Sequence, residues 1–283
     1  MKAELNAELG AELGAKLNTV LSAVRVDQLL VERGLASSRA QAQRLIGSGV
    51  QWRDGGAWRV VGKNGDLVPP LAELELLDQA EARYVSRGGL KLEGALVESA
   101  LNVSGKFCLD VGQSTGGFTD CLLRHGAARV VGVDVGHGQL HASLRQDPRV
   151  LCIEGVNARS LSAEALAEAM AEPSGEQAKF DLIVADLAFI SLTLVLPALV
   201  PLLKPEGALL LLVKPQFELQ PGQVGKGGIV HAPALMKVVK KRITKCCADL
   251  GLDLRAWYDS AIKGGDGNRE FFVYAVKPIV ESP

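Results

Sequence analysis

A glycine-rich turn after an apolar run is the stretch of this sequence best suited to binding chemistry. Asp-Val-Gly-Gln-Ser-Thr-Gly-Gly-Phe, residues 110–118, follows Phe-Cys-Leu and precedes a helix-compatible segment, 119–124. A strand, a glycine turn and a helix in this order bring the backbone close to a nucleotide-like ligand, and glycines omit side chains that would block it. The spacing acidic-x-Gly-x-Ser-x-Gly differs from the Gly-x-Gly-x-x-Gly of dinucleotide sites. It favours S-adenosylmethionine over NAD.

A second carboxylate follows the next apolar run, because Asp134 ends Val-Val-Gly-Val. A carboxylate at that place can accept hydrogen bonds from the hydroxyls of a ribose. We therefore predict a cofactor site formed by Asp110, Gly112, Ser114, Gly116, Asp134 and Asn157. In it the glycines and Ser114 pass beneath the methionine part, and Asp110 lies near the amino group. Asn157 either meets the adenine edge or caps the helix that follows it.

Four charged residues farther along the chain could act on a substrate. They are Lys91, Asp186, Lys214 and Glu270. Each also has a structural explanation, since ion pairs and caps place charges near clefts too. Lys91 could be a solvated lysine opening a helix, Asp186 a strand-end cap and Glu270 a strand-edge charge. Lys214 directly follows an apolar strand, which makes a surface role harder to argue.

The elements that must position these residues form a repeating pattern. Seven strand candidates alternate with helix-length segments: residues 106–111, 129–134, 150–153, 180–185, 208–213, 252–257 and 270–276. Apolar runs without alternation predict a doubly wound, mainly parallel sheet buried on both faces. The last two runs predict an antiparallel hairpin at one edge. Ligands of parallel sheets lie beyond the carboxyl ends of the strands, where Asp110, Asp134, Asn157, Asp186 and Lys214 fall.

Composition limits the alternatives. The chain has 283 residues, of which 48% are apolar and 22% charged, and a net charge of −1. This is an ordinary globular balance, and any basic surface must be local. The five cysteines and four histidines show neither a disulfide framework nor a metal-site spacing, so no metal is predicted. No secretory signal or bilayer-spanning run is visible, and we expect a cytoplasmic protein without a membrane partner.

The N-terminal third divides in two. Residues 1–24 carry leucine at every fourth position, with glycines at 10 and 14, and predict a partly helical extension. Residues 25–80 predict two helices and then a terminal strand over 67–76. Gly34 ends the first helix, and Ser37 or Ser38 caps the second. Seven basic and three acidic residues lie between Arg25 and Lys63. We expect Arg25, Arg33, Arg39 and Arg44 to bind RNA phosphates, the alternative being a helical hairpin with a solvated basic face. The large domain is 81–283.

Residues 25–46, from Arg-Val-Asp-Gln-Leu-Leu to Gln-Arg-Leu-Ile, resemble the S4-like RNA-binding domain. Gln51 to Gly56 stand where that family usually has Val-Asn-Gly. The four charged residues resemble the Lys-Asp-Lys-Glu tetrad of the FtsJ-like RNA 2′-O-methyltransferases. With Arg-Tyr-Val-Ser-Arg-Gly-Gly-Leu-Lys-Leu at 83–92 and Gly-Asn-Arg-Glu-Phe at 267–271, the order of motifs resembles the hemolysin A-type (TlyA) subgroup over residues 25–277.

The resemblance implies an S-adenosylmethionine-dependent enzyme that methylates the ribose 2′-hydroxyl of cytidine in ribosomal RNA. It implies Lys214 as base, Asp186 as its orienting partner, and Lys91 and Glu270 as residues that position the ribose. Three alternatives stay open. A non-catalytic ribosome-assembly factor would not need the charged set. A pseudouridine synthase would not use the glycine turn, and a small-molecule methyltransferase would leave the basic helices unexplained.

Overall fold

The computed structural model describes residues 23–36, 38–77, 83–170 and 178–279. They belong to two compact units divided between Arg83 and Tyr84, and each unit is described by itself. Nearly all of the predicted extension, residues 1–24, and the predicted boundary near Glu81 lie outside the described residues.

The N-terminal unit packs two helices against short strands. Its elements are β1 (Val24–Arg25), α2 (Val26–Glu32), α3 (Arg39–Gly49), β2 (Val50–Arg53), β3 (Arg59–Val60), β4 (Leu67–Val68) and β5 (Glu73–Leu76). Ser38 caps α3, since its hydroxyl accepts a hydrogen bond from the Gln41 amide at 3.2 Å. Val26 and Leu30 of α2 and Leu45 of α3 are fully buried in a common core.

The single strand predicted over 67–76 is wrong. Its two halves, β4 and β5, pair with different strands: β4 lies antiparallel to β1, and β5 lies antiparallel to β2. Pro69 and Pro70 stand between them, and proline lacks the N–H that a strand ladder requires. The chain therefore leaves one sheet before it enters the next.

The C-terminal unit contains a seven-stranded sheet with the order β11-β12-β10-β9-β6-β7-β8. The strands are β6 (Phe107–Val111), β7 (Arg129–Asp134), β8 (Val150–Glu154), β9 (Phe180–Ala185), β10 (Leu203–Val213), β11 (Asp253–Asp259) and β12 (Phe271–Val276). β12 is antiparallel to both of its neighbours, and the other six strands share one direction. The mainly parallel sheet and the antiparallel edge hairpin are confirmed.

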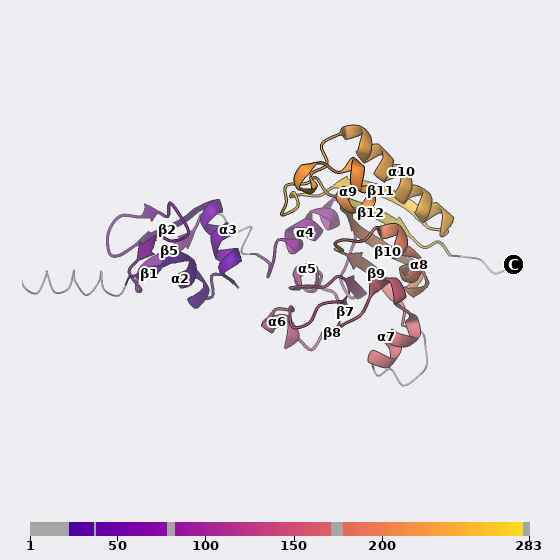
Figure 1. Cartoon of the computed structure of the whole chain (residues 1–283). Coiled ribbons are helices and arrows are strands. Elements are labelled where there is room, and N and C mark those ends of the chain that lie inside the picture. The colour runs from indigo at the N-terminus through magenta and orange to yellow at the C-terminus, as the bar shows by residue number, and fades with distance from the viewer. Residues whose placement is uncertain (1–22, 37, 78–82, 171–177, 280–283) are drawn as a thin grey trace, which may run out of the picture. The chain divides into compact units, whose positions relative to one another are not determined.

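Helices cover both faces of this sheet (Figure 1). One core lies under α4 (Gly88–Ser99) and α5 (Gly117–Arg124) and the other under α7 (Ala163–Ala169), α8 (Leu196–Leu199) and α10 (Pro233–Asp249). Short elements complete the unit: α6 (Ala142–Arg145), α9 (Pro215–Glu218) and the 3₁₀ turns η2 (Ala158–Ser160), η3 (Leu192–Leu194), η4 (Val200–Leu202), η5 (Pro221–Gln223) and η6 (Lys226–Gly228). Within the described segments, no helix is long and apolar enough to cross a membrane.

Candidate active site

The glycine-rich turn crosses the carboxyl ends of two neighbouring strands. The amides of Gly112 and Gln113 both donate to the carbonyl of Val133, at 2.9 and 3.1 Å. Gly112 has a left-handed φ of 83°, and a Cβ there would lie 2.6 Å from the carbonyl oxygen of Asp186. A side chain at this position would therefore push the turn away from the strand end that carries Asp186.

Asp134 holds the far side of the turn. Its Oδ2 accepts a hydrogen bond from the Ser114 amide at 2.8 Å, and its Oδ1 accepts one from the Gly136 amide at 2.7 Å. Ser114 itself has a left-handed φ of 47°, and its hydroxyl donates to Gln139. Each carboxylate oxygen can accept a second hydrogen bond, so Asp134 remains able to bind hydroxyl groups.

A cavity of about 520 Å³ opens beside the turn. Gly112, Ser114 and Asp134 line one part of it, and Asp186 and Lys214 line another. Its volume lies within the ~300–1,000 Å³ of small-molecule and cofactor sites. The cavity thus brings together three of the predicted cofactor residues and two of the predicted catalytic residues.

The other three predicted cofactor residues lie elsewhere. Asp110 is fully buried beneath the turn, where Oδ2 accepts a hydrogen bond from the Thr119 hydroxyl at 2.7 Å. Gly116 begins α5, and a Cβ on it would meet the side chain of Leu144 at 2.3 Å. Asn157 is exposed and caps η2 by accepting from the Arg159 amide. None of the three lines the cavity, although Val156 and Ala158 beside Asn157 do.

Burial changes the acid–base properties of Asp110. Because the carboxyl group is removed from water, and because Asp186 and Asp134 add negative charge, its pKa rises to about 7 against the opposing hydrogen bond from Thr119. Its Oδ1 is buried without a hydrogen-bond partner among the described residues. A buried acceptor of this kind is suited to a positively charged group.

The four charged residues form two ion pairs. Lys214 Nζ lies 2.5 Å from Asp186 Oδ1, with side chains 15% and 23% exposed. Lys91 Nζ lies 2.6 Å from Glu270 Oε2, with side chains 10% and 2% exposed. Pairing explains how such charges stay buried, since an unpaired charge there would be costly.

Strand order explains why the two pairs lie on one edge. Asp186 and Lys214 directly follow β9 and β10, which run in the same direction. Glu270 precedes β12, which runs in the opposite direction, and the register pairs Val213 with Phe271. The start of β12 therefore meets the end of β10, and Lys214 and Glu270 are the residues that lie just beyond the last pair of the ladder.

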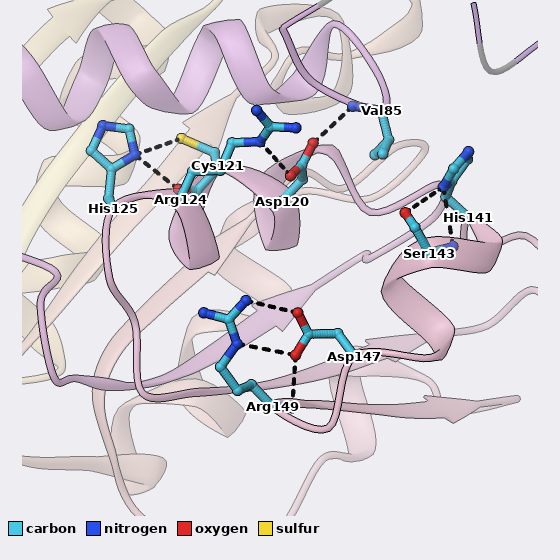
Figure 2. Close-up of polar contacts among 9 residues, drawn as sticks. All are labelled: Val85, Asp120, Cys121, Arg124, His125, His141, Ser143, Asp147 and Arg149. Carbon is cyan, nitrogen blue, oxygen red and sulfur yellow. Dashed lines mark hydrogen bonds and ion pairs between the residues drawn. The ribbon is translucent and has the colours of Figure 1, made fainter. Parts of the chain in front are cut away.

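The segment that leads into α4 is fixed by α5. Asp120 of α5 accepts a hydrogen bond from the Val85 amide at 2.9 Å and pairs with Arg124 at 2.7 Å, as Figure 2 shows. Ser86 and Gly88 follow Val85 and line the cavity, and Lys91 lies one turn farther along α4. The position of Lys91 thus depends on α5, the helix that the glycine turn begins.

Glu218 is a functional candidate that the sequence did not reveal. It is 3% exposed; Oε2 accepts from the Ser191 hydroxyl at 2.5 Å and Oε1 from the Leu192 amide at 2.7 Å. Burial raises its pKa, against those two hydrogen bonds and the charge of Arg242. Glu218 ties the segment after Asp186 to the segment after Lys214. Its sequence position, four residues beyond Lys214 in Lys-Pro-Gln-Phe-Glu, was the only available signal.

Asn268 has a comparable role on the other side of the site. It is 1% exposed, accepts from the Val230 amide, and donates to the Gly228 carbonyl and to Asp266. These bonds join the loop before Glu270 to the loop before α10. The asparagine in Gly-Asn-Arg-Glu-Phe is therefore a structural part of that motif.

The four arginines predicted to bind RNA make contacts inside the N-terminal unit. Arg25 and Arg39 lie 2.9 and 3.1 Å from Oδ2 of Asp27, which is fully buried. Arg33 donates to the carbonyls of Pro70 and Ala72, and Arg44 donates to a carbonyl of its own helix. At least three of them thus help to hold the unit together.

Comparison with known proteins places this geometry in a family. The FtsJ-like methyltransferase model matches residues 84–277. The chain belongs to the FtsJ-like methyltransferase family. A 16S/23S rRNA (cytidine-2′-O)-methyltransferase TlyA from Mycobacterium tuberculosis is 45% identical over 250 residues, which is 88% of each chain. Hemolysin A from Brachyspira hyodysenteriae is 37% identical over 89% of this chain and 100% of its own.

A solved structure supports the same assignment. A hemolysin-like protein from Streptococcus thermophilus superposes with a TM-score of 0.68 at 38% identity, covering 91% of this chain and 89% of that one. The predicted relationship to the TlyA group of this family is therefore confirmed, and with it the methyltransferase fold of the C-terminal unit.

Proposed function

We propose that this protein methylates the 2′-hydroxyl of cytidine riboses in ribosomal RNA, with S-adenosylmethionine as the methyl donor. The observation that carries the proposal is the Lys214–Asp186 pair on the wall of the cavity, with the Lys91–Glu270 pair next to it at the same sheet edge. The M. tuberculosis relative, named for this reaction on 16S and 23S RNA, supports it.

The cavity fits S-adenosylmethionine by its size and by its chemistry. Asp134 offers free acceptor positions for the ribose hydroxyls, and the turn from Gly112 to Ser114, in which Gly112 has no side chain, lines the part of the cavity available to the methionine part. The unpartnered Oδ1 of Asp110 suits a cationic amino group, though Asp110 lies behind the cavity lining. When bound, S-adenosylmethionine supplies a methyl group on a positively charged sulfur.

The residues of this chain must then orient the hydroxyl and remove its proton. Lys214 acts as the base in its neutral form, after its ammonium has released a proton to water. Its Nζ then accepts the proton of the 2′-hydroxyl as that oxygen takes the methyl group, and Asp186 holds the nitrogen in place through the 2.5 Å contact. Lys91 and Glu270 fix the ribose from the side of α4. Such alignment can supply up to ~7–11 kcal/mol of the barrier reduction, and a positioned base typically contributes about 10²–10⁴-fold in rate.

In this proposal the N-terminal unit binds the RNA substrate. Its helices α2 and α3 carry the S4-like pattern, and the outward N–H groups of Arg25, Arg33, Arg39 and Arg44 contact phosphates. Arg25 and Arg39 have side chains 45% and 61% exposed, so the bond to Asp27 leaves part of each guanidinium accessible. A ribosomal substrate places the protein in the cytoplasm.

The test is methyl transfer from labelled S-adenosylmethionine to purified ribosomal subunits, followed by mapping of 2′-O-methylated riboses. Label on cytidine 2′-oxygens is expected, and Lys214→Ala should abolish it while cofactor binding persists. Lys204→Ala is the matched control, because Lys204 pairs with Asp181 at the opposite ends of the same two strands. Label on bases, or undiminished transfer by Lys214→Ala, would contradict the proposal.

A further inference from the structure

Helix α10 concentrates positive charge that the proposed chemistry does not use. Its 17 residues include Lys237, Lys240, Lys241, Arg242 and Lys245 but a single acidic residue, Asp249. The helix thus carries a net charge of +4 in a chain whose net charge is −1. A local excess of this size marks a surface that attracts anions.

Three of these lysines form a row on the exposed side of α10. Lys237, Lys241 and Lys245 are spaced four residues apart and all are exposed, whereas Val239, Ile243 and Cys247 face the core. Residues four apart on a helix are neighbours, about 6 Å along the axis. Like charges at this spacing destabilise a helix. The row is therefore unfavourable in the free protein unless an anionic partner neutralises it.

Three of the five positively charged side chains of the helix, one of them in this row, are already engaged. Lys245 pairs with Asp249 at 2.7 Å, and Lys240 lies over the ring of Trp257 at 5.7 Å. Arg242 donates to the Glu218 carbonyl at 2.7 Å and to the Thr193 hydroxyl. Lys237 and Lys241 make no ion pair or hydrogen bond with any described residue. They are the two cations with capacity for an external partner.

The arrangement of the sheet places the N-terminal end of α10 toward the catalytic edge, the edge at which β9 and β10 end and Asp186 and Lys214 lie. β10 ends at that edge, and β11, which follows α10, runs in the same direction as β10. The chain must therefore return through α10 to the opposite edge before β11 begins. Lys237, near the start of α10, lies closer to the catalytic edge than Lys245. Arg242 fixes the helix to Glu218, the residue that ties together the segments after Asp186 and Lys214.

We propose that Lys237 and Lys241, the two members of the row that have no ion pair with a described residue, form a phosphate-binding row that contacts the RNA backbone next to the nucleotide being methylated. This rests on the proposed function for the identity of the polyanion. RNA is preferred over an acidic protein because Lys237 and Lys241 are exposed on α10 (Figure 1), whose first turns lie toward the sheet edge where the proposed RNA substrate must bind. The row would hold the strand that enters the cavity, independently of the N-terminal unit.

The experiment measures binding of a fluorescein-labelled fragment of 23S ribosomal RNA to the full chain across a salt series. Each phosphate contact contributes about 0.7 to the slope of log K against log salt for a single strand. Lys237→Gln/Lys241→Gln should therefore lower the slope by about 1.4. If the plots of log K against log salt for the wild type and the double variant converge near 1 M salt, the affinity of the variant at 0.1 M is roughly 25-fold lower.

The control removes the same charge from lysines that are already paired. Lys204→Gln/Lys245→Gln should leave the slope unchanged, because Asp181 and Asp249 already neutralise those side chains. Lys237→Gln/Lys241→Gln should unfold at the same temperature as wild type or higher, since it relieves repulsion. Weaker RNA binding in a protein that is no less stable cannot come from misfolding.

A wild-type slope and affinity in Lys237→Gln/Lys241→Gln would overturn the inference, even if methyl transfer to cytidine is observed. Equal loss of binding to polyglutamate and to RNA would also overturn it, because the row would then not be specific to a nucleic acid partner. A lowered slope in a protein that methylates no RNA would leave the row standing and refute the proposed function instead.

Discussion

Variants of the Lys91–Glu270 ion pair can separate its contribution to the free energy of unfolding from its contribution to methyl transfer. Its atoms lie 2.6 Å apart, and the side chains are 10% and 2% exposed. Lys91→Met or Glu270→Gln alone leaves one uncompensated charge in the interior, which costs about 3–5 kcal/mol. For a unit of this size, ~1 kcal/mol shifts the melting temperature by about 2–4 °C. Each single variant should therefore melt roughly 6–20 °C below wild type.

The double variant Lys91→Met/Glu270→Gln should recover most of this loss, because removing a whole buried pair is often neutral or stabilising. If the pair positions the ribose, methyl transfer to ribosomal subunits should stay abolished in all three variants. Thermal unfolding and transfer assays on the same preparations measure both quantities. A double variant that regains activity together with stability would refute the positioning role and make the pair purely structural.

The Lys204–Asp181 pair supplies the comparison for magnitude. Its atoms lie 2.9 Å apart, but its side chains are 42% and 28% exposed. Water then screens the charges, and pairs of this kind are worth about 0–1 kcal/mol. Lys204→Met should lower the melting temperature by only a few degrees at most and leave activity unchanged. A loss as large as that of Lys91→Met would show that burial does not determine the cost.

Two further variants and one control test the turn. Gly112→Ala should abolish S-adenosylmethionine binding in calorimetric titration, because its Cβ would lie 2.6 Å from the Asp186 carbonyl oxygen. Gly105 is the control, because it is also left-handed but has open space around it. Gly105→Ala should lower the free energy of unfolding by only about 1–2 kcal/mol and keep cofactor binding. Between about pH 4 and 7 the folded Asp110 carboxyl, whose pKa is raised to about 7, binds more protons than the unfolded one. The free energy of unfolding of the wild type therefore falls as pH rises through this interval. Asp110→Asn lacks this titration and should become more stable relative to wild type over the same interval. Melting temperatures that stay parallel between pH 5 and 8 would contradict this.

Apolar patterning was sufficient to predict the sheet, because strands buried on both faces consist of continuous apolar residues. Six of the seven predicted segments match their strands within about two residues at either end. The exception is β10, which begins at Leu203 and not at Ala208. Residues 204–207 read Lys-Pro-Glu-Gly and so lack an apolar run, and the pairing with β9 shifts register between Leu203 and Ala208. That irregularity depends on the neighbouring strand and leaves no local pattern.

The functions of the glycines and arginines were harder to predict, because residue type does not reveal the neighbour. Gly112 and Gly116 are predicted to make room for a ligand, and the structure adds a second constraint, because the nearest atoms to their missing Cβ atoms belong to Asp186 and Leu144. Arg25 and Arg39 are predicted to bind RNA, and the structure adds an intramolecular contact that the sequence does not reveal, because both pair with a buried carboxylate, Asp27. Asp186 and Leu144 are distant in sequence from these glycines. Asp27 is near Arg25 in sequence, but the residues around it do not indicate that its carboxylate is buried.

The reversed strand β12 shows why the catalytic set needs this sheet and not a wholly parallel one. A parallel strand beside β10 would place its amino-terminal end at the opposite edge, about 20 Å away for a strand of six residues. Because β12 is antiparallel, the residue that precedes it, Glu270, comes to the same edge as Asp186 and Lys214. Glu270 can then accept Lys91 from α4, a helix on one face of the sheet. Two strands that end, one that begins and one helix thus meet at a single point. The sequence order Lys, Asp, Lys, Glu reflects that topology: each charge belongs to a different element, and only the direction of β12 allows the last to join the others.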